Sequence, residues 1–363
     1  MSGEQQVKMN PLVSIIVNNY NYGRFVGEAI ESALAQSYRN TEVIVVDDGS
    51  TDNSREVIAG YGSRIIPVLK ANGGQGSAFN AGFAASRGEF VLFLDADDVQ
   101  EPNAIETALG EWKDGATRIF FPLRAVDANG RLLGRIIGGT AESSALLGPF
   151  GCGSPTSGNV FSRATLEKIM PIPEEDWRIC ADFYLCGASS VFGDGMRLEH
   201  LLGRYRVHEE NNFHSLQLLA RVRRDISLNF KLHHALFRLT DRKIGTLENW
   251  LGASPEYWIR RIRSFRESPQ DHPWPDTLRF LTGSLIRAAW RYPSWNFRRK
   301  LGYTAFSIAY SFLPWKIATA LKDMRDGTRG RVLGCVLGSK TNPESDPIIK
   351  KPERAWLTSQ RSR

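Results

Sequence analysis

The chain has 363 residues and is 42% hydrophobic, a length and composition that fit a globular protein with a full core and exclude a disordered chain. No secretory signal pattern opens the sequence, so we expect a cytoplasmic protein. The four cysteines follow neither a metal-binding nor a disulfide spacing, which excludes a disulfide-rich scaffold and predicts reduced thiols.

The net charge of +7 is distributed unevenly along the chain. Residues 1–214 carry 18 Lys and Arg against 27 Asp and Glu, a net charge of −9. Residues 215–363 carry 28 against 12, a net charge of +16. A basic half predicts an anionic partner, either nucleic acid or an anionic membrane surface, and an ordinary Arg-rich helical domain is the alternative.

The first part of the chain alternates strand and helix patterns. Short apolar runs predict buried strands at residues 12–17, 42–46, 65–69 and 90–94. Helices are predicted at residues 24–36, 53–59 and 102–112, and from the glycine-rich segment 71–82. This order predicts an α/β fold with a mostly parallel sheet and flanking helices, in which Pro67 moves the third strand to an edge or an irregular position.

The segments that follow are shorter. A strand is predicted at residues 118–123, with a hairpin-like turn at 128–131. Residues 151–159 are too rich in Gly and Ser for regular structure, and a strand at 160–163 comes after them. An acidic segment then predicts a helix that opens near Glu174.

Polar clusters follow three of the predicted parallel strands, at residues 18–21, 47–52 and 95–98. Parallel strands joined by right-handed crossovers bring such ends to one edge of the sheet, so we expect a crevice lined with carboxylates and amides. Three carboxylates within residues 95–98 repel one another unless a cation lies among them. Oxygen ligands suit Mg²⁺ or Mn²⁺, and a solvated acidic turn is the alternative.

The glycine-rich segment 71–82 enters a helix, whose N-terminus is expected to offer free N–H groups to phosphate oxygens. It is neither a Walker loop nor the dinucleotide fingerprint. A flexible turn is the alternative.

Four segments together resemble the motifs of family 2 of the glycosyltransferases, in their order and spacing. They are the runs 11–21, 45–52, 72–82 and 94–98, and the resemblance covers roughly residues 11–210. Members of this family are inverting enzymes of the GT-A fold that use nucleotide sugars. The resemblance implies the same fold here, followed by a basic and mainly helical C-terminal region.

The resemblance also implies roles for single residues. Asp48 would contact the nucleobase, Asp95 the ribose or the sugar, and Asp97 of the Asp-x-Asp motif the metal that bridges the diphosphate. Phe79 stands where many relatives have an arginine, so more of the diphosphate charge would fall to the metal. The implied donor-binding residues are Asn19, Asp48, Gly74, Asn80, Asp95 and Ala96, and the implied metal ligands are Asp97 and His208.

Inverting transfer needs a base that takes the proton of the acceptor hydroxyl. We predict that this base is Asp182, because Ala181-Asp182 resembles the acidic family motif at the start of a helix, with its first acid lost. Glu174, Glu175 and Asp176 are the alternatives, and each is also explained as an acid favoured by a helix dipole.

The resemblance ends near residue 210. A basic helical region is expected at residues 215–338, where it would position the acceptor or place the protein at a membrane surface. Residues 301–315 are uncharged and too few for the ~20 residues that span a bilayer. Aromatic residues at 290–297 and the basic run 298–300 favour a helix in the membrane interface, and a buried helix is the alternative. Residues 339–363 are predicted to be a disordered tail.

The expected function is hexosyl or related transfer from a nucleoside diphosphate sugar to a hydroxyl of a saccharide or lipid-linked glycan, assisted by Mn²⁺ or Mg²⁺. We expect it to serve cell-surface polysaccharide synthesis, with peripheral contact at the inner face of the cytoplasmic membrane. No nucleic acid partner is expected, since no nucleic-acid motif is visible. The alternatives are transfer to a polyprenyl phosphate and a nucleotide-sugar binding module without turnover.

Overall fold

A computed structural model describes most of the first 211 residues and several helices beyond them. The chain divides into two compact units, Met1–Trp295 and Asn296–Arg363. The predicted domain boundary at residue 214 and the predicted tail lie outside the described residues. The described residues are 10–139, 153–209, 211, 228, 231–232, 234–236, 238–240, 255–267, 277–291, 296–314 and 316–320.

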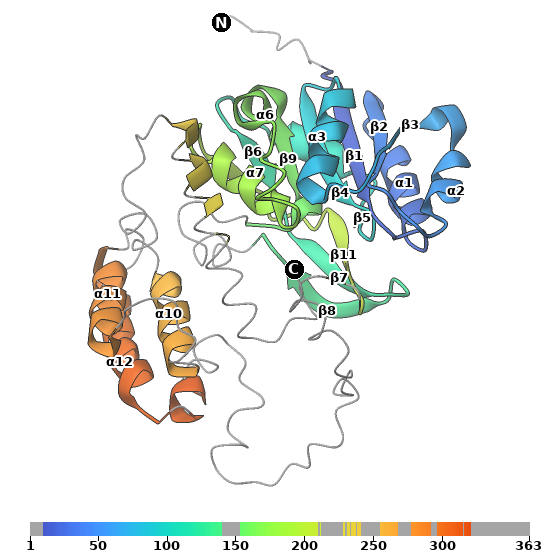
Figure 1. Cartoon of the computed structure of the whole chain (residues 1–363). Coiled ribbons are helices and arrows are strands. Elements are labelled where there is room, and N and C mark those ends of the chain that lie inside the picture. The colour runs from blue at the N-terminus through green and yellow to red at the C-terminus, as the bar shows by residue number, and fades with distance from the viewer. Residues whose placement is uncertain are drawn as a thin grey trace, which may run out of the picture. The chain divides into compact units, whose positions relative to one another are not determined.

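A mixed, mostly parallel sheet forms the centre of the first unit (Figure 1). Neighbouring strands are parallel except around β9, which runs antiparallel to both β4 and β6. β3 lies at one edge, as Pro67 predicts, because a proline cannot donate to the ladder. In spatial order the strands are β10 (Gly195–Arg197), β6 (Arg118–Phe120), β9 (Asn159–Ser162), β4 (Phe90–Asp95), β1 (Val13–Asn19), β2 (Thr41–Asp47) and β3 (Ile66–Leu69).

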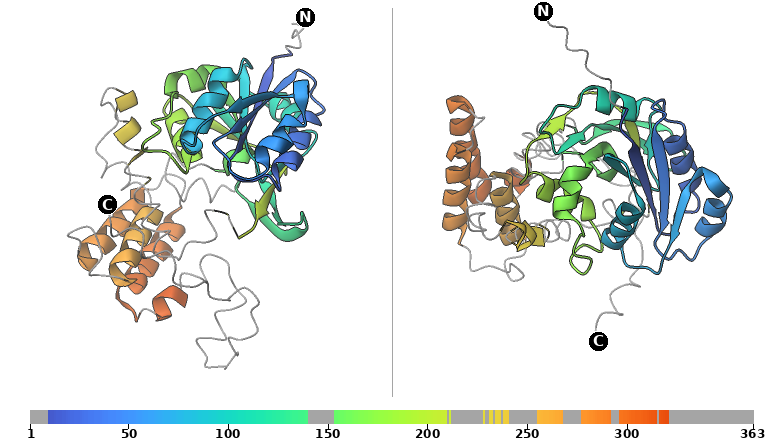
Figure 2. Two further views of the ribbon diagram at one scale, coloured as in Figure 1. Left: turned by 45° about the vertical axis from the view of Figure 1, so that its right-hand side comes forward. Right: turned by 90° about the horizontal axis from the view of Figure 1, so that it is seen from above.

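Helices cover both faces of this sheet (Figure 2), which explains why the central strands are apolar without alternation. Ile15 packs into one hydrophobic cluster and its neighbour Ile16 into the other, on the opposite face. The first cluster includes α1 (Val26–Leu34), α2 (Ser54–Ala59) and α4 (Ala104–Gly110), and the second includes α3 (Gln75–Ala85), α6 (Arg163–Ile169) and α7 (Ala181–Ser189).

The strand predicted at residues 118–123 is split in the structure. β6 ends at Phe120, and after Pro122 the chain enters β7 (Leu123–Asp127) in a second sheet. The turn predicted at residues 128–131 joins β7 to β8 (Leu132–Ile137), as expected. The second sheet has the order β5 (Val99–Gln100), β11 (Gly203–Val207), β7 and β8, so it begins directly after the acidic residues 95–98.

The helix predicted to open at Glu174 begins only at Ala181. The carbonyl of Pro173 accepts the N–H groups of Asp176 and Trp177, which closes a turn there. Cys180 has a left-handed conformation with φ of 58°, so a right-handed helix cannot continue through it.

The described segments of the C-terminal region from residue 255 to residue 320 form helices, as predicted. In the first unit α10 (Pro255–Glu267) packs against α11 (Leu278–Arg291), with the Trp258 and Phe280 rings 5.9 Å apart. The second unit contains α12 (Phe297–Phe312). Among the helices that the structure describes, none has the length and apolar character needed to cross a bilayer.

Gly82 permits the close packing of α3 on the sheet, since a Cβ there would lie 2.4 Å from Ile16 Cγ2. We predict that Gly82→Ala lowers the free energy of unfolding by about 1–3 kcal/mol, because the added methyl overpacks the core. Gly27→Ala in α1 is the matched control, since its Cβ would meet Tyr61 and Val57 at an ordinary 3.6 Å. Urea unfolding decides, and equal stability of the two variants would contradict this packing.

Candidate functional site

The strand register brings the predicted polar ends together at one edge of the sheet, which confirms that expectation. Asn18 of β1 pairs with Asp95 of β4, and Asn19 pairs with Asp47 of β2. Asn18 Nδ2 donates a hydrogen bond of 2.8 Å to Asp95 Oδ1. Asn19 Nδ2 donates one of 3.0 Å to Asp47 Oδ2.

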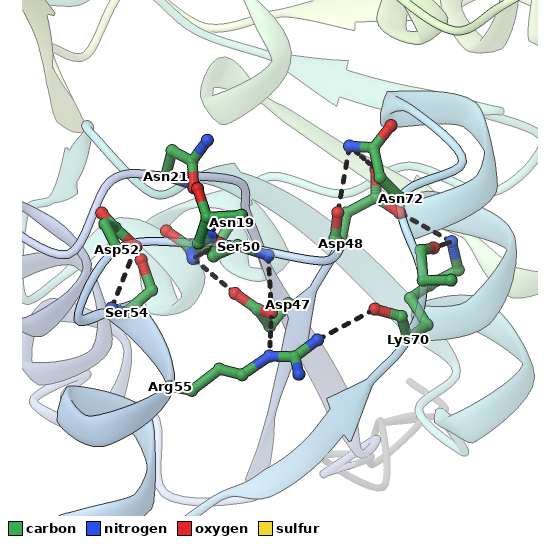
Figure 3. Close-up of polar contacts among 12 residues, drawn as sticks. Asn19, Asn21, Asp47, Asp48, Ser50, Asp52, Ser54, Arg55, Lys70 and Asn72 are labelled. Carbon is green, nitrogen blue, oxygen red and sulfur yellow. Dashed lines mark hydrogen bonds and ion pairs between the residues drawn. The ribbon is translucent and has the colours of Figure 1, made fainter.

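Asp47 is fully buried and lies between polar partners (Figure 3). Burial alone would raise its pKa, but hydrogen bonds from Ser50, Arg55 and Asn19 together hold the pKa below its ordinary value. Asn19 also donates to Ser50 Oγ at 3.1 Å, while its Oδ1 is buried without a hydrogen-bond partner in the described part of the chain. Asn19, one of the implied donor-binding residues, thus lies at the end of β1 with one acceptor unpaired among the described residues, and its donor contact stays a prediction.

Asp48 holds the glycine-rich loop through its carboxylate (Figure 3). The backbone N–H groups of Gly73 and Gly74 donate to it at 2.9 and 2.7 Å. Lys70 Nζ donates at 2.6 Å and Asn72 Nδ2 at 3.2 Å. The described hydrogen bonds of this buried carboxylate therefore come from the glycine-rich loop and from Lys70 directly before it. A nucleobase contact of Asp48 stays a prediction.

The expectation of free N–H groups at the start of α3 is wrong for Gly74, Gln75 and Gly76. Gly74 donates to Asp48, and Gln75 N and Gly76 N donate to the carbonyls of Arg178 and Trp177 at 2.7 and 3.0 Å. Gly74 has a φ of 89°, and a Cβ there would lie 2.6 Å from the Arg178 carbonyl oxygen. These bonds join the loop to the segment before α7, and the role of Gly74 in donor binding stays a prediction.

The contacts described for Asn80 and Phe79 are with residues other than the acidic strand end at residues 95–98. Asn80 exchanges two hydrogen bonds with the backbone of Ile172, at 2.8 and 2.9 Å, and donates to Glu174 Oε1 at 3.0 Å. Phe79 is fully buried, with its ring 4.5 Å from that of Phe93. The residue that departs from the family pattern therefore belongs to the core, and donor contact by Asn80 stays a prediction.

Three carboxylates gather after β4, and we call Asp95, Asp97 and Asp98 the acidic cluster. Burial, and then the charges of Asp97 and Asp182, raise the pKa of Asp95 to about 8. Burial and the charges of Asp97 and Asp95 raise the pKa of Asp98 well above its ordinary value. Ser157 Oγ donates to Asp98 at 2.7 Å, and Ala96, inside the cluster, donates its N–H to the Asn18 carbonyl.

The two predicted metal ligands lie side by side. His208 Nε2 is 3.0 Å from Asp97 Oδ2, and Asn211 Nδ2 donates to the same oxygen at 3.1 Å. The rings of Tyr22 and Phe25 pack on the His208 ring at centroid distances of 5.4 and 4.9 Å. His208 directly follows β11, which ends at Val207, and this strand brings the ring to its position.

The chemistry of these side chains fits a divalent cation only in part. Within the described ranges, no group of three or more His, Cys, Asp or Glu side chains is arranged to hold a metal ion. Mg²⁺ and Mn²⁺ are commonly held by one or two carboxylates, with substrate phosphates and waters as further ligands. The mutual repulsion within the acidic cluster fits such an open site.

Asp182, the predicted base, lies in the first turn of α7, and its charge contributes to the raised pKa of Asp95. The alternatives have other partners. Hydrogen bonds from Asn80 and Ser77 lower the pKa of Glu174, and Arg238 lies 3.6 Å from Asp176. The start of α7 is linked to Asp95 through the side chain of Gln75, while the role of Asp182 as a base stays a prediction.

Several site residues carry no signal in the sequence. The glycine-rich loop contains no charged residue, and Lys70 and Arg178 bring positive charge to it. Arg178 Nη2 donates to Asn72 at 2.8 Å, and Lys70 Nζ donates to Asp48, which holds the loop. Gln75 reaches Asp95, and Ser157 reaches Asp98, from distant positions in the chain. Only the topology brings these side chains to the strand ends, so no local pattern could have identified them.

An α/β fold with an acidic cluster after a parallel strand defines the class as GT-A. The crystal structure of S. aureus TarS 1–349 shares this fold, with a TM-score of 0.52, 17% sequence identity and coverage of 87% of this chain and 91% of that chain. The TarS 1–349 complex with UDP gives the same TM-score at 18% identity.

The family follows from the sequence comparisons. Residues 14–139 match the model of Glycosyl transferase family 2. An uncharacterized glycosyltransferase of Nostoc sp. is 38% identical over 212 residues, which are 55% of this chain and 66% of that protein. One of Rickettsia prowazekii is 48% identical over 97 residues, 27% of this chain and 30% of that protein. Residues 14–139 therefore form a family 2 glycosyltransferase domain, and the chain spans less than two thirds of these relatives' lengths.

The contacts of Asp48 generate a prediction on stability. Asp48→Asn should lower the free energy of unfolding by about 2–4 kcal/mol, because the loop N–H groups and Lys70 lose a buried charged acceptor. The control is Glu31→Gln, whose exposed pair with Arg64 should contribute about 0–0.5 kcal/mol. Urea unfolding measures both, and an Asp48→Asn loss no larger than that of the control would show that the loop does not depend on this carboxylate.

Proposed function

We propose that the chain is an inverting glycosyltransferase that moves a sugar from a nucleoside diphosphate sugar to a hydroxyl of a saccharide or lipid-linked glycan. The observation that carries this proposal is the link from the start of α7, which bears Asp182, through the side chain of Gln75 to Asp95 at the carboxyl end of β4. The family 2 domain, and the shared fold of TarS, which was crystallised with UDP, support a nucleotide sugar as the donor. A role in cell-surface polysaccharide synthesis belongs to the same proposal.

The donor would lie along the ends of β1, β2 and β4. Asn19 has a buried acceptor available there, and Asp95 would contact the ribose or the sugar. Asp97 and His208 would hold Mg²⁺ or Mn²⁺, which when bound neutralises charge on the diphosphate. Lys70 lies near enough to add positive charge to the same region, because its ammonium already contacts the glycine-rich loop.

The transfer step needs one proton acceptor on the acceptor side. The hydroxyl oxygen attacks the anomeric carbon, the bond from that carbon to the diphosphate oxygen breaks, and the hydroxyl proton passes to the Asp182 carboxylate. Because attack and departure occur on opposite faces, the anomeric configuration inverts. Asp182 suits this role since it comes from α7, whereas Asn19, Asp48 and Asp95 come from the ends of β1, β2 and β4.

We also propose that α12 lies on an anionic membrane surface. Its exposed side chains include Phe297, Leu301, Ile308 and Phe312, and Arg298 is exposed beside them. Aromatic and aliphatic side chains next to basic ones suit the head-group region of a bilayer. Such contact would place the enzyme at the inner face of the cytoplasmic membrane, near a lipid-linked acceptor.

Asp182→Asn keeps the shape of the side chain and removes its basicity. We predict that it lowers the transfer rate about 10²–10⁴-fold, while the affinity for UDP stays near that of the wild type, since a base acts on the acceptor proton alone. The assay is UDP release from UDP-sugars over a panel of saccharide acceptors, with UDP affinity from calorimetry.

Glu174→Gln and Asp176→Asn are the matched controls and should remain nearly fully active. If one of them carries the loss and Asp182→Asn does not, the assignment of the base is wrong. If Asp182→Asn keeps full activity only with a polyprenyl phosphate, that compound is favoured as the acceptor, because it is already an anion and needs no strong base.

Donor binding should depend on a divalent metal and on pH. Burial and the charge of Asp97 help to raise the pKa of Asp95 to about 8, and a cation held at Asp97 would favour the ionised form of Asp95. The affinity for UDP with Mn²⁺ should therefore rise about tenfold from pH 6.5 to 8.5. Asp97→Ala should weaken UDP binding and reduce the effect of Mn²⁺. Calorimetry measures both, and equal UDP affinity in Mn²⁺ and in EDTA would exclude the metal.

Membrane contact should depend on the basic run at the start of α12. Replacing Arg298, Arg299 and Lys300 with Gln should abolish flotation with anionic liposomes, since each basic residue near the surface contributes about 1 kcal/mol. Replacing the exposed Lys113, Arg131 and Arg135 instead removes the same charge and should leave flotation intact. Equal flotation of both triple variants, or flotation with neutral lipid, would contradict the proposed contact.

A further inference from the structure

Gln75, the first residue of α3, links two parts of the site through its side chain. Its Oε1 accepts the backbone N–H of Ala181 at 2.8 Å. Its Nε2 donates to Asp95 Oδ1 at 3.4 Å. One amide group therefore connects the first residue of α7 to the acidic cluster.

The chemistry of the two partners fixes the orientation of this amide. A backbone N–H only donates, so Ala181 requires the amide oxygen. A carboxylate accepts, so Asp95 takes the amide nitrogen. No other neutral side chain of this length offers an acceptor at one end and a donor at the other.

The start of α7 depends on a contact from outside the helix. Cys180, the N-cap residue, makes no capping hydrogen bond with its side chain and has a left-handed backbone. The first N–H groups of a helix have no partner within it, and Gln75 supplies an acceptor for the N–H of Ala181. Asp182 is the next residue, so the bond to Ala181 lies one peptide away from the proposed base.

We infer that Gln75 is a positioning residue, which holds the α7 turn carrying Asp182 at a fixed place relative to Asp95. This inference rests on the proposed function, because it assigns a catalytic consequence to the position of Asp182. The two ends of the amide have separable effects. Asp95 keeps a 2.8 Å bond from Asn18 when Gln75 is lost, whereas Ala181 loses the acceptor that Gln75 provides.

Two variants of similar size separate these ends. Gln75→Met removes both hydrogen bonds and keeps the backbone contact with Arg178. Gln75→Glu keeps an acceptor for Ala181 and places a negative charge beside Asp95. Four measurements on the full chain compare them: the melting temperature, the UDP affinity in Mn²⁺, the rate of UDP release with the best saccharide acceptor, and hydrogen exchange of the first turn of α7.

We expect Gln75→Met to release UDP about 10–100-fold more slowly, with UDP affinity within about threefold of the wild type and faster hydrogen exchange at the start of α7. Gln75→Glu should restore the slow exchange and most of the rate at saturating donor, and it should weaken UDP binding at least fivefold. A role in stability alone would lower the melting temperature of Gln75→Met and leave the rate per folded molecule unchanged.

The inference is overturned if folded Gln75→Met matches the wild type in rate and in hydrogen exchange at α7. If the wild type shows no turnover with any acceptor, the proposed function fails instead. Hydrogen exchange still decides in that case whether Gln75 holds α7, because it does not depend on turnover.

Discussion

The site depends on carboxylates that are held close together at the ends of neighbouring strands. β1 pairs with β2 on one side and β4 on the other, which places Asn18 beside Asp95 and Asn19 beside Asp47. Burial and mutual repulsion raise the pKa values of Asp95 and Asp98, an arrangement that costs folding free energy. Such perturbed groups are typical of functional sites, where a cation or a reacting group compensates them.

The architecture of the sheet could be predicted from the sequence because its signals are local. β1, β2 and β4 each contain a short run of buried apolar residues that ends on polar ones, so period, burial and topology agree. The start of α7 could not be predicted, since the left-handed Cys180 and the turn at Pro173 interrupt a segment whose composition favours a helix. The break between β6 and β7 likewise depends on which sheet each half joins.

The acidic residues of the candidate site could be predicted from the sequence, whereas their polar partners could not. Asp95 and Asp97 stand at a strand end, whereas Gln75 and Ser157 reach them from other parts of the chain. The glycine-rich loop shows the same limit. Its composition predicts free N–H groups, but tertiary contacts with Asp48 and with the carbonyls before α7 use them.

The central claim is that donor and base meet at one edge of the sheet. A crystal structure of the chain with UDP and Mn²⁺ tests this most directly, because the anomalous signal of manganese locates the metal independently of the protein. We expect a manganese peak at the carboxylate of Asp97, with the diphosphate beside it and Asp182 facing the position of the anomeric carbon. Manganese and UDP bound away from Asp97, or Asp182 turned away from the diphosphate, would contradict the claim.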